Sequence, residues 1–291
     1  MSWRHYHLAL RLKCPLHIGY RKVGNLMQTR RYVPARTIWG ALVFTFTQKF
    51  GGPFKEWEKF LNDNFRFGYF WPSAEKERVT LFPWDDPQTF DYFYLDAYVS
   101  TATQSLVPSA EEGSLHHVEF ISPFTLGSAK VKERDVSNGE QVFLVGDLWA
   151  KENNGRIKMP RNTQKGIDDL LKDLSFTLGG ERTYGWGRII VEECKLKEDE
   201  LLISPDWNWR ENNQKIIVQP RKDNLRVLAH VEAVSIEEKI AGYPEPLTAY
   251  RFKGNFDFEF EGVCFPPGSL LTDSNISFEI TEAGIWKSAG P

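Results

Sequence analysis

The order of patterned segments along the first two thirds of the chain constrains the fold most strongly. Residues 3–18 alternate apolar and polar side chains with a period of two, which indicates a half-buried strand. A helical pattern begins at Pro34 and Thr37 and runs to Phe50, and a second short helix is expected over 55–65. Two strands, a helix and a closing strand are then expected at 115–121, 141–149, 167–178 and 189–195. This order predicts an α+β fold of the ferredoxin-like βαββαβ kind, with a large insertion between its halves.

The insertion is expected to hold strands and loops. Residues 66–107 are rich in aromatic side chains and are broken by prolines. Within them, Asp85 and Asp86 precede Pro87, which is typical of a turn.

Residues 19–31, between the first strand and the first helix, are polar and basic and are expected to form a loop.

The C-terminal region is mainly β in pattern. Its strand candidates are 215–218, 225–234, 252–260 and 276–280. We therefore expect two domains: a ferredoxin-like (RRM-related) domain with insertions over residues 1–197, and a smaller, mainly β domain over residues 198–291.

Composition excludes several classes of protein. With 41% hydrophobic and 26% charged residues, the chain is expected to bury a globular core. It has no apolar run of about 18 residues, and its N-terminus lacks the apolar region of a signal peptide. The cysteines at positions 14, 194 and 264 are too far apart in sequence for a disulfide framework or a CxxC metal pair. We therefore expect a cytoplasmic protein with no membrane segment, no metal and no cofactor.

Charge is distributed unevenly along the chain. Residues 1–55 contain ten Lys and Arg side chains and no Asp or Glu, although the whole chain has a net charge of −3. A basic segment on an acidic body favours one surface that binds a polyanion. The alternative is that the early strands simply have basic edges.

A glycine-rich turn over residues 179–188 is the strongest local signal. Its four glycines can adopt positive φ and approach a ligand closely, while two arginines and two aromatic side chains stand between them. Backbone N–H groups beside arginines favour phosphate, and flat side chains favour stacked bases. The candidate residues are Gly179, Gly180, Arg182, Thr183, Tyr184, Gly185, Trp186, Gly187 and Arg188. The equally weighted alternative is a glycine-rich hairpin with a buried Trp.

A second candidate site surrounds the start of the first helix. There a loop leads into a helix N-terminus, whose free N–H groups favour a phosphate. The basic and polar residues around it are Arg30, Arg31, Arg36 and Thr37.

Three motifs together resemble those of RAMP proteins from CRISPR effector complexes. The first strand ends in PLHIG at 15–19, the first helix begins in YVPARTIWGAL at 32–42, and the glycine-rich segment LGGERTYGWGR occupies 178–188. Each motif alone is weak, but the three occur in the family's order and cover most of residues 1–197. Residues 198–291 carry no such motif. One departure is Ala35-Arg36-Thr37, where the family more often has a run of small residues.

This resemblance implies a ferredoxin-like fold that binds crRNA through the glycine-rich loop. It is closest to the type III subunit that caps the 5′ handle of the crRNA and contacts the large signalling subunit and the first backbone subunit. Backbone subunits cut target RNA with an Asp in the loop before the helix motif. Residues 19–33 contain no Asp or Glu, so this cleavage chemistry is expected to be missing.

Histidines provide the alternative of catalysis. Some RAMP relatives process crRNA without metal, with a His as general acid or base, and His5, His7 and His17 lie on or beside the first strand. Alternation places His5 and His7 on the face of Arg11, which favours surface or RNA contact over catalysis.

Three hypotheses remain at this stage. The first is a non-catalytic crRNA 5′-handle-binding subunit whose partners are crRNA and other effector subunits, with target RNA nearby. The second is a metal-independent crRNA-processing endoribonuclease. The third is a protein scaffold without RNA, for which the glycine-rich turn would be buried and the basic residues scattered.

Overall fold

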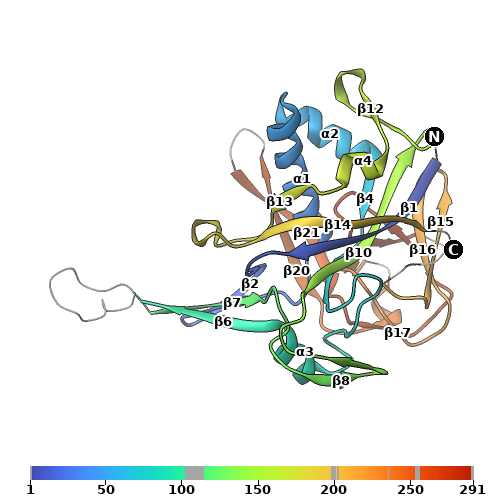
Figure 1. The fold of residues 1–291 in the computed structure, drawn as a ribbon. Coiled ribbons are helices and arrows are strands. Elements are labelled where there is room, and N and C mark those ends of the chain that lie inside the picture. The colour runs from blue at the N-terminus through green and yellow to red at the C-terminus, as the bar shows by residue number, and fades with distance from the viewer. Residues whose placement is uncertain are drawn as a thin grey trace.

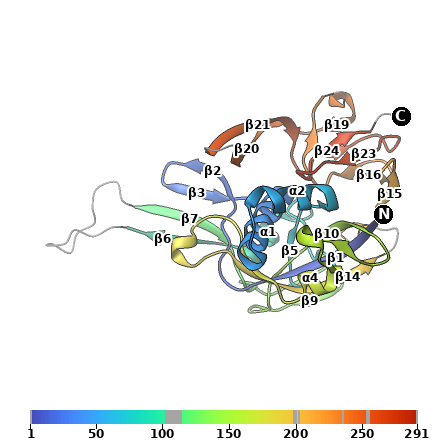
Figure 2. The same ribbon diagram turned by 90° about the horizontal axis from the view of Figure 1, so that it is seen from above.

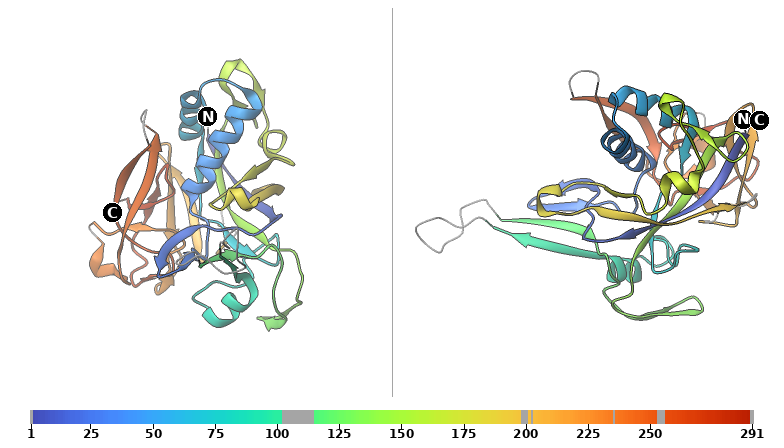
Figure 3. Two further views of the ribbon diagram at one scale, coloured as in Figure 1. Left: turned by 90° about the vertical axis from the view of Figure 1, so that its left-hand side faces the viewer. Right: turned by 45° about the horizontal axis from the view of Figure 1, so that its top comes forward.

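The computed structural model describes residues 2–101, 115–197, 201, 203–234, 236–252 and 256–289. It is a mixed α/β structure with few helices and mainly antiparallel sheets. The N-terminal and C-terminal parts of the chain each form an extended sheet. Figure 3 shows the C-terminal strands packed along one side of the N-terminal part.

The N-terminal sheet is antiparallel throughout, and β1 lies at its centre (Figure 1). Its strand order is β13-β14-β1-β10-β4, with β5 also paired to β10. The strands are β1 (Ser2–Leu12), β4 (Phe65–Phe67), β5 (Trp71–Ser73), β10 (Phe143–Glu152), β13 (Ser175–Thr177) and β14 (Arg188–Lys197).

Three helices cover one face of this sheet: α1 (Ala35–Phe50), α2 (Phe54–Asn64) and α4 (Ile167–Leu171). Helix α1 follows Pro34 and ends at Gly51, whose positive φ of 71° lets its N–H reach the carbonyl of Thr47. Both helices expected near the N-terminus are therefore present. The helix expected over 167–178 is wrong beyond Leu171, because residues 175–177 pair with β14 as an edge strand.

A four-stranded sheet projects from the body as an arm (Figures 1 and 3). Its strand order is β2-β3-β7-β6, formed by β2 (Gly19–Val23), β3 (Leu26–Thr29), β6 (Leu95–Ser100) and β7 (His116–Ile121). The loop expected over 19–31 is therefore wrong. It is a hairpin that turns at Gly24, with a φ of 59°, and its β3 pairs in parallel with β7.

Helix α3 (Pro87–Tyr94) precedes β6, and the turn expected before Pro87 leads into it, with the Asp85 N–H donating to the Phe82 carbonyl at 3.1 Å. The Asp86 side chain accepts a hydrogen bond from the Thr89 N–H at 3.1 Å, and Pro87 occupies the first helical turn. These are ordinary signals of a helix start, which the sequence did carry. Smaller elements complete this half: β8 (Ala129–Val131), β9 (Arg134–Val136), β11 (Ile157–Lys158), η1 (Pro160–Asn162), β12 (Gln164–Lys165) and η2 (Arg182–Tyr184).

The C-terminal region is built of strands, as expected. Its larger sheet contains β15 (Trp207–Asn212), β16 (Lys215–Pro220), β18 (Val231–Glu232), β20 (Glu245–Phe252), β21 (Phe256–Phe265), β23 (Phe278–Ile280) and β24 (Trp286–Ser288). A smaller sheet contains β17 (Leu225–Arg226), β19 (Ile240–Ala241) and β22 (Leu270–Leu271), and η3 (Glu237–Lys239) precedes β19.

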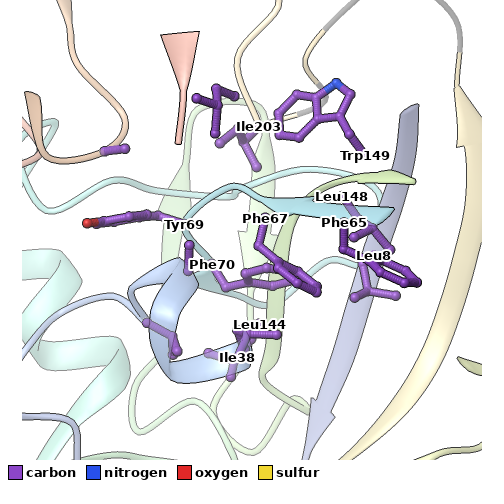
Figure 4. Close-up of a cluster of buried hydrophobic side chains, with 14 of the residues drawn as sticks. Leu8, Ile38, Phe65, Phe67, Tyr69, Phe70, Leu144, Leu148, Trp149 and Ile203 are labelled. Atoms are coloured by element: carbon purple, nitrogen blue, oxygen red, sulfur yellow. The ribbon is translucent and has the colours of Figure 1, made fainter. Parts of the chain in front are cut away.

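One hydrophobic core joins the two halves. Ile38 of α1, Leu144 of β10 and Ile203 of the C-terminal region belong to the same buried cluster (Figure 4). Packing is tight at Gly146, where an added Cβ would lie 2.7 Å from the Phe70 ring. Among the described residues, no helix is long and apolar enough to cross a membrane.

Strand β1 is buried on both faces, so the half-buried strand expected from its alternation is wrong. His5 is fully buried, stacks on Trp149 with ring centroids 5.1 Å apart, and bonds to Asp147 Oδ1 at 2.8 Å. Trp209, from the C-terminal region, lies 5.7 Å from the same ring. His7 is also buried and bonds to the carbonyl of Lys76. The surface position expected for His5 and His7 fails because the C-terminal region and the insertion cover that face.

Candidate nucleic-acid interface

A groove of about 860 Å³ lies where the three sequence motifs meet. The PLHIG motif after β1 contributes Ile18 and Gly19, and the glycine-rich loop contributes Gly179 and Gly180. The start of α1 contributes Pro34, Arg36, Thr37 and Gly40. The opposite wall comes from β20 and β21, which lie close to β2 and β3 in Figure 2. The fold thus brings segments that are more than 140 residues apart into one concavity.

The glycine-rich loop is packed onto the PLHIG segment that follows β1. The N–H of Gly180 donates to the carbonyl of His17 at 2.9 Å, and the N–H of Gly187 donates to Pro15 at 2.8 Å. A Cβ on Gly179 would lie 2.2 Å from the His17 carbonyl oxygen, and its φ is +71°. These glycines therefore serve close packing within the chain. The N–H groups of Gly180 and Gly187 do not form the phosphate cradle expected from the sequence.

The side chains of this loop are more available than its backbone. Arg182, Thr183 and Arg188 are exposed, and Arg182 Nε donates to the carbonyl of Gly179 at 3.2 Å. Neither arginine has an acidic partner among the residues that the structure describes. Two exposed guanidinium groups without acidic partners, on the loop whose Gly179 and Gly180 line the groove, favour a phosphate backbone.

The two aromatic residues of the loop differ in exposure. Tyr184 is 48% exposed and its ring centroid lies 5.8 Å from that of Tyr98 on the arm. Trp186 is only 9% exposed and packs against Phe120, with centroids 5.0 Å apart. The loop thus combines a buried Trp, which attaches it to the arm, with a Tyr whose face remains available for stacking.

The arginines near α1 are all paired with carboxylates. Arg30 donates to Glu245 at 3.0 Å, and Arg31 grips Asp91 through two hydrogen bonds of 2.7 and 2.5 Å. The acidic partners lie on later elements: Glu245 on β20, Asp91 on α3, and Glu261, which pairs with Arg36, on β21. The acid-free N-terminal segment therefore faces acids supplied by later parts of the chain, while Thr37 lines the groove without such a charge.

A buried polar chain supports Glu245. Its Oε1 lies 2.8 Å from His230 Nε2, and His230 Nδ1 lies 2.7 Å from the Tyr69 hydroxyl. Burial raises the pKa of Tyr69, so its hydroxyl keeps its proton and donates to Nδ1, which leaves Nε2–H to donate to Glu245. Burial raises the pKa of Glu245, but the hydrogen bond from His230 and the charge of Arg30 outweigh it and lower that pKa to about 2. Glu245 is therefore ionised at every physiological pH.

Acidification is expected to destabilise the fold. Burial lowers the pKa of both His7 and His230, so below about pH 6.5 the unfolded chain binds protons that the folded chain does not. Stability should be fully present above pH 6.5 and fall by up to about 1.4 kcal/mol per pH unit for each histidine. Urea unfolding at pH 7.5 and 5.5 measures this, and His7→Gln should weaken the dependence. A stability that is unchanged or higher at pH 5.5 contradicts the assignment.

His17, the last of the three histidines considered for catalysis, does not line the groove. His17 is 7% exposed and its Nδ1 bonds to the carbonyl of Glu119 at 2.7 Å. The three histidines considered for catalysis are thus held in internal hydrogen bonds. Within the described ranges no three His, Cys, Asp or Glu side chains gather as metal ligands.

Comparison with known proteins identifies the family. The chain matches the model of the RAMP superfamily over residues 9–190, more than half of its length, and therefore belongs to this superfamily. No relative was found among curated protein sequences.

Among solved structures, the chain is similar to subunits in complexes described as Type III-B Cmr-beta. A chain of the complex bound to cognate target RNA and AMPPnP gives a TM-score of 0.48 and 11% identity, covering 92% of this chain and 86% of that one. The complex bound to cognate target RNA gives 0.47 and 12% with the same coverage, and the apo state gives 0.37 and 10%, covering 67% and 98%.

Proposed function

We propose that this chain is a non-catalytic, crRNA-binding subunit of a type III CRISPR effector complex that holds the 5′ handle of the crRNA. The observation that carries the proposal is the meeting of all three RAMP motifs in one groove, whose glycine-rich loop also bears two exposed arginines without acidic partners in the described residues. In such a complex its partners are the large signalling subunit and the backbone RAMP subunits, with target RNA nearby, in the cytoplasm. It needs neither metal nor cofactor for this role.

On this proposal, different side chains of the groove and of the glycine-rich loop contact different groups of a single RNA strand. Arg182 and Arg188 bind successive phosphates, and Thr183 adds a hydroxyl to the same stretch. Tyr184 stacks on a splayed base, because a half-exposed aromatic face accepts any base without reading it. Thr37, on the first turn of α1, donates to a phosphate where the helix dipole also favours negative charge.

We also propose that the sheet β14-β1-β10-β4 is the ferredoxin-like unit expected from the sequence. Its support is the antiparallel pairing, together with the helices α1 and α2 between β1 and β4 and the helix α4 between β10 and β14. On this proposal residues 1–197 are the RAMP domain with insertions, and residues 198–291 are a second, mainly β domain that closes the groove.

The acids of β20 and β21 limit how well the groove binds RNA. Arg36 is engaged by Glu261, so a phosphate must compete with this carboxylate and meets its negative charge. Glu261→Gln should therefore raise the affinity for RNA by about three- to tenfold at low salt. Fluorescence anisotropy with labelled RNA measures the change.

Glu232→Gln is the matched control, because Glu232 also pairs with a cation, Lys287, but lies outside the groove. Its RNA affinity should equal that of the wild type. If Glu261→Gln folds normally and binds RNA no more tightly than this control, Arg36 does not contact RNA.

The experiment that tests the proposed function is recovery of RNA from the natively purified protein, expressed with and without its genomic neighbours. Sequencing should find short, repeat-derived RNA with a uniform 5′ end. If the isolated chain instead cleaves added repeat RNA in EDTA, it is an endoribonuclease. If neither preparation holds or binds RNA at low salt, the chain is a protein scaffold and the proposal is wrong.

A further inference from the structure

A second cavity, of about 400 Å³, adjoins the groove. Tyr20, Arg30 and Glu245 line both cavities, so they form the wall between them. The volume falls in the range of about 300–1,000 Å³ that is usual for small-ligand sites. The sequence motifs give no sign of this cavity, because half of its lining comes from the C-terminal region.

The cavity is lined with flat and apolar surfaces. Tyr20 is 44% exposed, and the guanidinium carbon of Arg30 lies 4.8 Å from its ring centroid, which fixes the ring. Trp84 packs edge-on against the buried Trp71 at 5.0 Å and parallel to Phe82 at 4.7 Å. Pro83, Pro266 and Pro267 complete these walls. Rigid rings of this kind suit a planar heterocycle.

Polar groups of both signs accompany these rings. The hydrogen bonds from Arg30 and His230 both go to Glu245 Oε1, so Oε2 remains an acceptor with no recorded partner in the described part of the chain. Arg226 is exposed, and its Nη1 is oriented by a 2.9 Å hydrogen bond to the carbonyl of Gly268. The lining of the cavity thus combines an anionic acceptor with a cation.

We propose that this cavity binds a guanine nucleotide. The base stacks on the aromatic walls, its Watson–Crick edge donates to Glu245 Oε2, and its phosphate pairs with Arg226. The nucleotide is either free or one residue of an RNA strand in the adjoining groove, and only the second source rests on the proposed function.

Guanine fits best because of the donors on its edge. Guanine presents two adjacent N–H donors, at N1 and N2, to a single carboxylate. Adenine and cytosine present one exocyclic amine beside an acceptor, and uracil presents one N–H between two carbonyls. An ionised carboxylate repels the acceptors of the other three bases, so it selects the base with adjacent donors.

Titration of the purified full-length chain with GMP, AMP, CMP and UMP tests the proposal, by calorimetry and by tryptophan fluorescence. GMP should bind at least about tenfold more tightly than each of the others. Arg226→Ala should weaken GMP, and Glu245→Gln should remove the preference for guanine. Glu245→Gln also alters the bonds to Arg30 and His230. Arg226→Ala removes an exposed side chain and therefore leaves the fold intact.

Tyr20→Ala should also weaken GMP, because it removes one aromatic wall of the cavity. The controls are Glu232→Gln, matched to Glu245→Gln, and Tyr92→Ala, matched to Tyr20→Ala. Tyr92 is 58% exposed on α3 and lies outside the cavity. Equal binding of the four nucleotides, absence of binding at millimolar GMP, or equal effects of variant and control would overturn the proposal.

Repeat-derived RNA that carries 6-thioguanosine distinguishes the two sources. Crosslinks to Tyr20 or Trp84, suppressed by GMP, identify an RNA guanine as the ligand, whereas GMP binding without such crosslinks identifies a free nucleotide. If the chain binds GMP but does not bind RNA, the proposed function is wrong and the proposal for the cavity is supported. RNA binding with no guanine preference refutes only the pocket.

Discussion

Gly187→Ala is expected to lower the free energy of unfolding by about 3 kcal/mol or more. The residue has a φ of +83°, and a Cβ there would lie 1.9 Å from the carbonyl oxygen of Leu178. The obstacle is backbone, and it is held by the hydrogen bond from the Leu178 N–H to the Gly187 carbonyl at 2.8 Å. Strained φ and a forced backbone shift each cost about 1–3 kcal/mol. Equilibrium unfolding in urea, followed by tryptophan fluorescence, measures the loss.

Gly185→Ala separates the two causes. Gly185 also has a positive φ, of +78°, but nothing lies within 4 Å of its Cβ position. Only the conformational cost applies there, so about 1 kcal/mol is expected. Equal losses in the two variants would show that the close packing of the glycine-rich loop on Leu178 is not what requires a glycine at position 187.

Arg182→Ala/Arg188→Ala is expected to lower the affinity for repeat-derived RNA by about 10- to 100-fold at low salt. Both side chains are exposed and have no acidic partner in the described residues, so their loss leaves the fold intact. Removing two phosphate contacts should also reduce the slope of log K against log salt by about 1.4 for a single strand. Anisotropy titrations at several salt concentrations give both quantities.

Arg4→Ala/Arg210→Ala is the matched control, because it removes the same charge from exposed positions outside both the glycine-rich loop and the groove. It should change affinity little beyond the general loss of positive charge. If both double variants weaken RNA binding equally and keep the same salt slope, the glycine-rich loop does not contact the phosphates.

Elements whose signals are local could be predicted from the sequence. Helix α1 follows from Pro34 and ends at Gly51, as expected from the chain alone. Helix α3 was equally accessible, since Asp86 caps it and Pro87 opens it, but a pair of acids before a proline is also typical of a turn. The three motifs of the candidate site were visible for the same reason.

The sequence did not show which strands are covered by distant parts of the chain. Alternation along β1 indicated one exposed face, yet His5 is buried beneath Trp209, more than 200 residues away. Whether a second layer covers a strand depends on tertiary packing, which no local pattern records. The roles expected for His5 and His7 at a surface failed on this point.

Basic and acidic residues that are separated along the chain are not separated in the folded structure. The run 1–55 holds no acid, but Arg30 and Arg36 meet Glu245 and Glu261 across the groove. A count along the sequence cannot anticipate such pairing. Arg182 and Arg188, in a mixed segment, have no acidic partner among the described residues.

Photocrosslinking of repeat-derived 5′-handle RNA to the purified chain, with peptides identified by mass spectrometry, tests the central claim most directly. The account predicts crosslinks to Tyr184 and to peptides lining the groove, lost in Arg182→Ala/Arg188→Ala and retained in Arg4→Ala/Arg210→Ala. Crosslinks confined to other surfaces, or equally strong in both double variants, would contradict it.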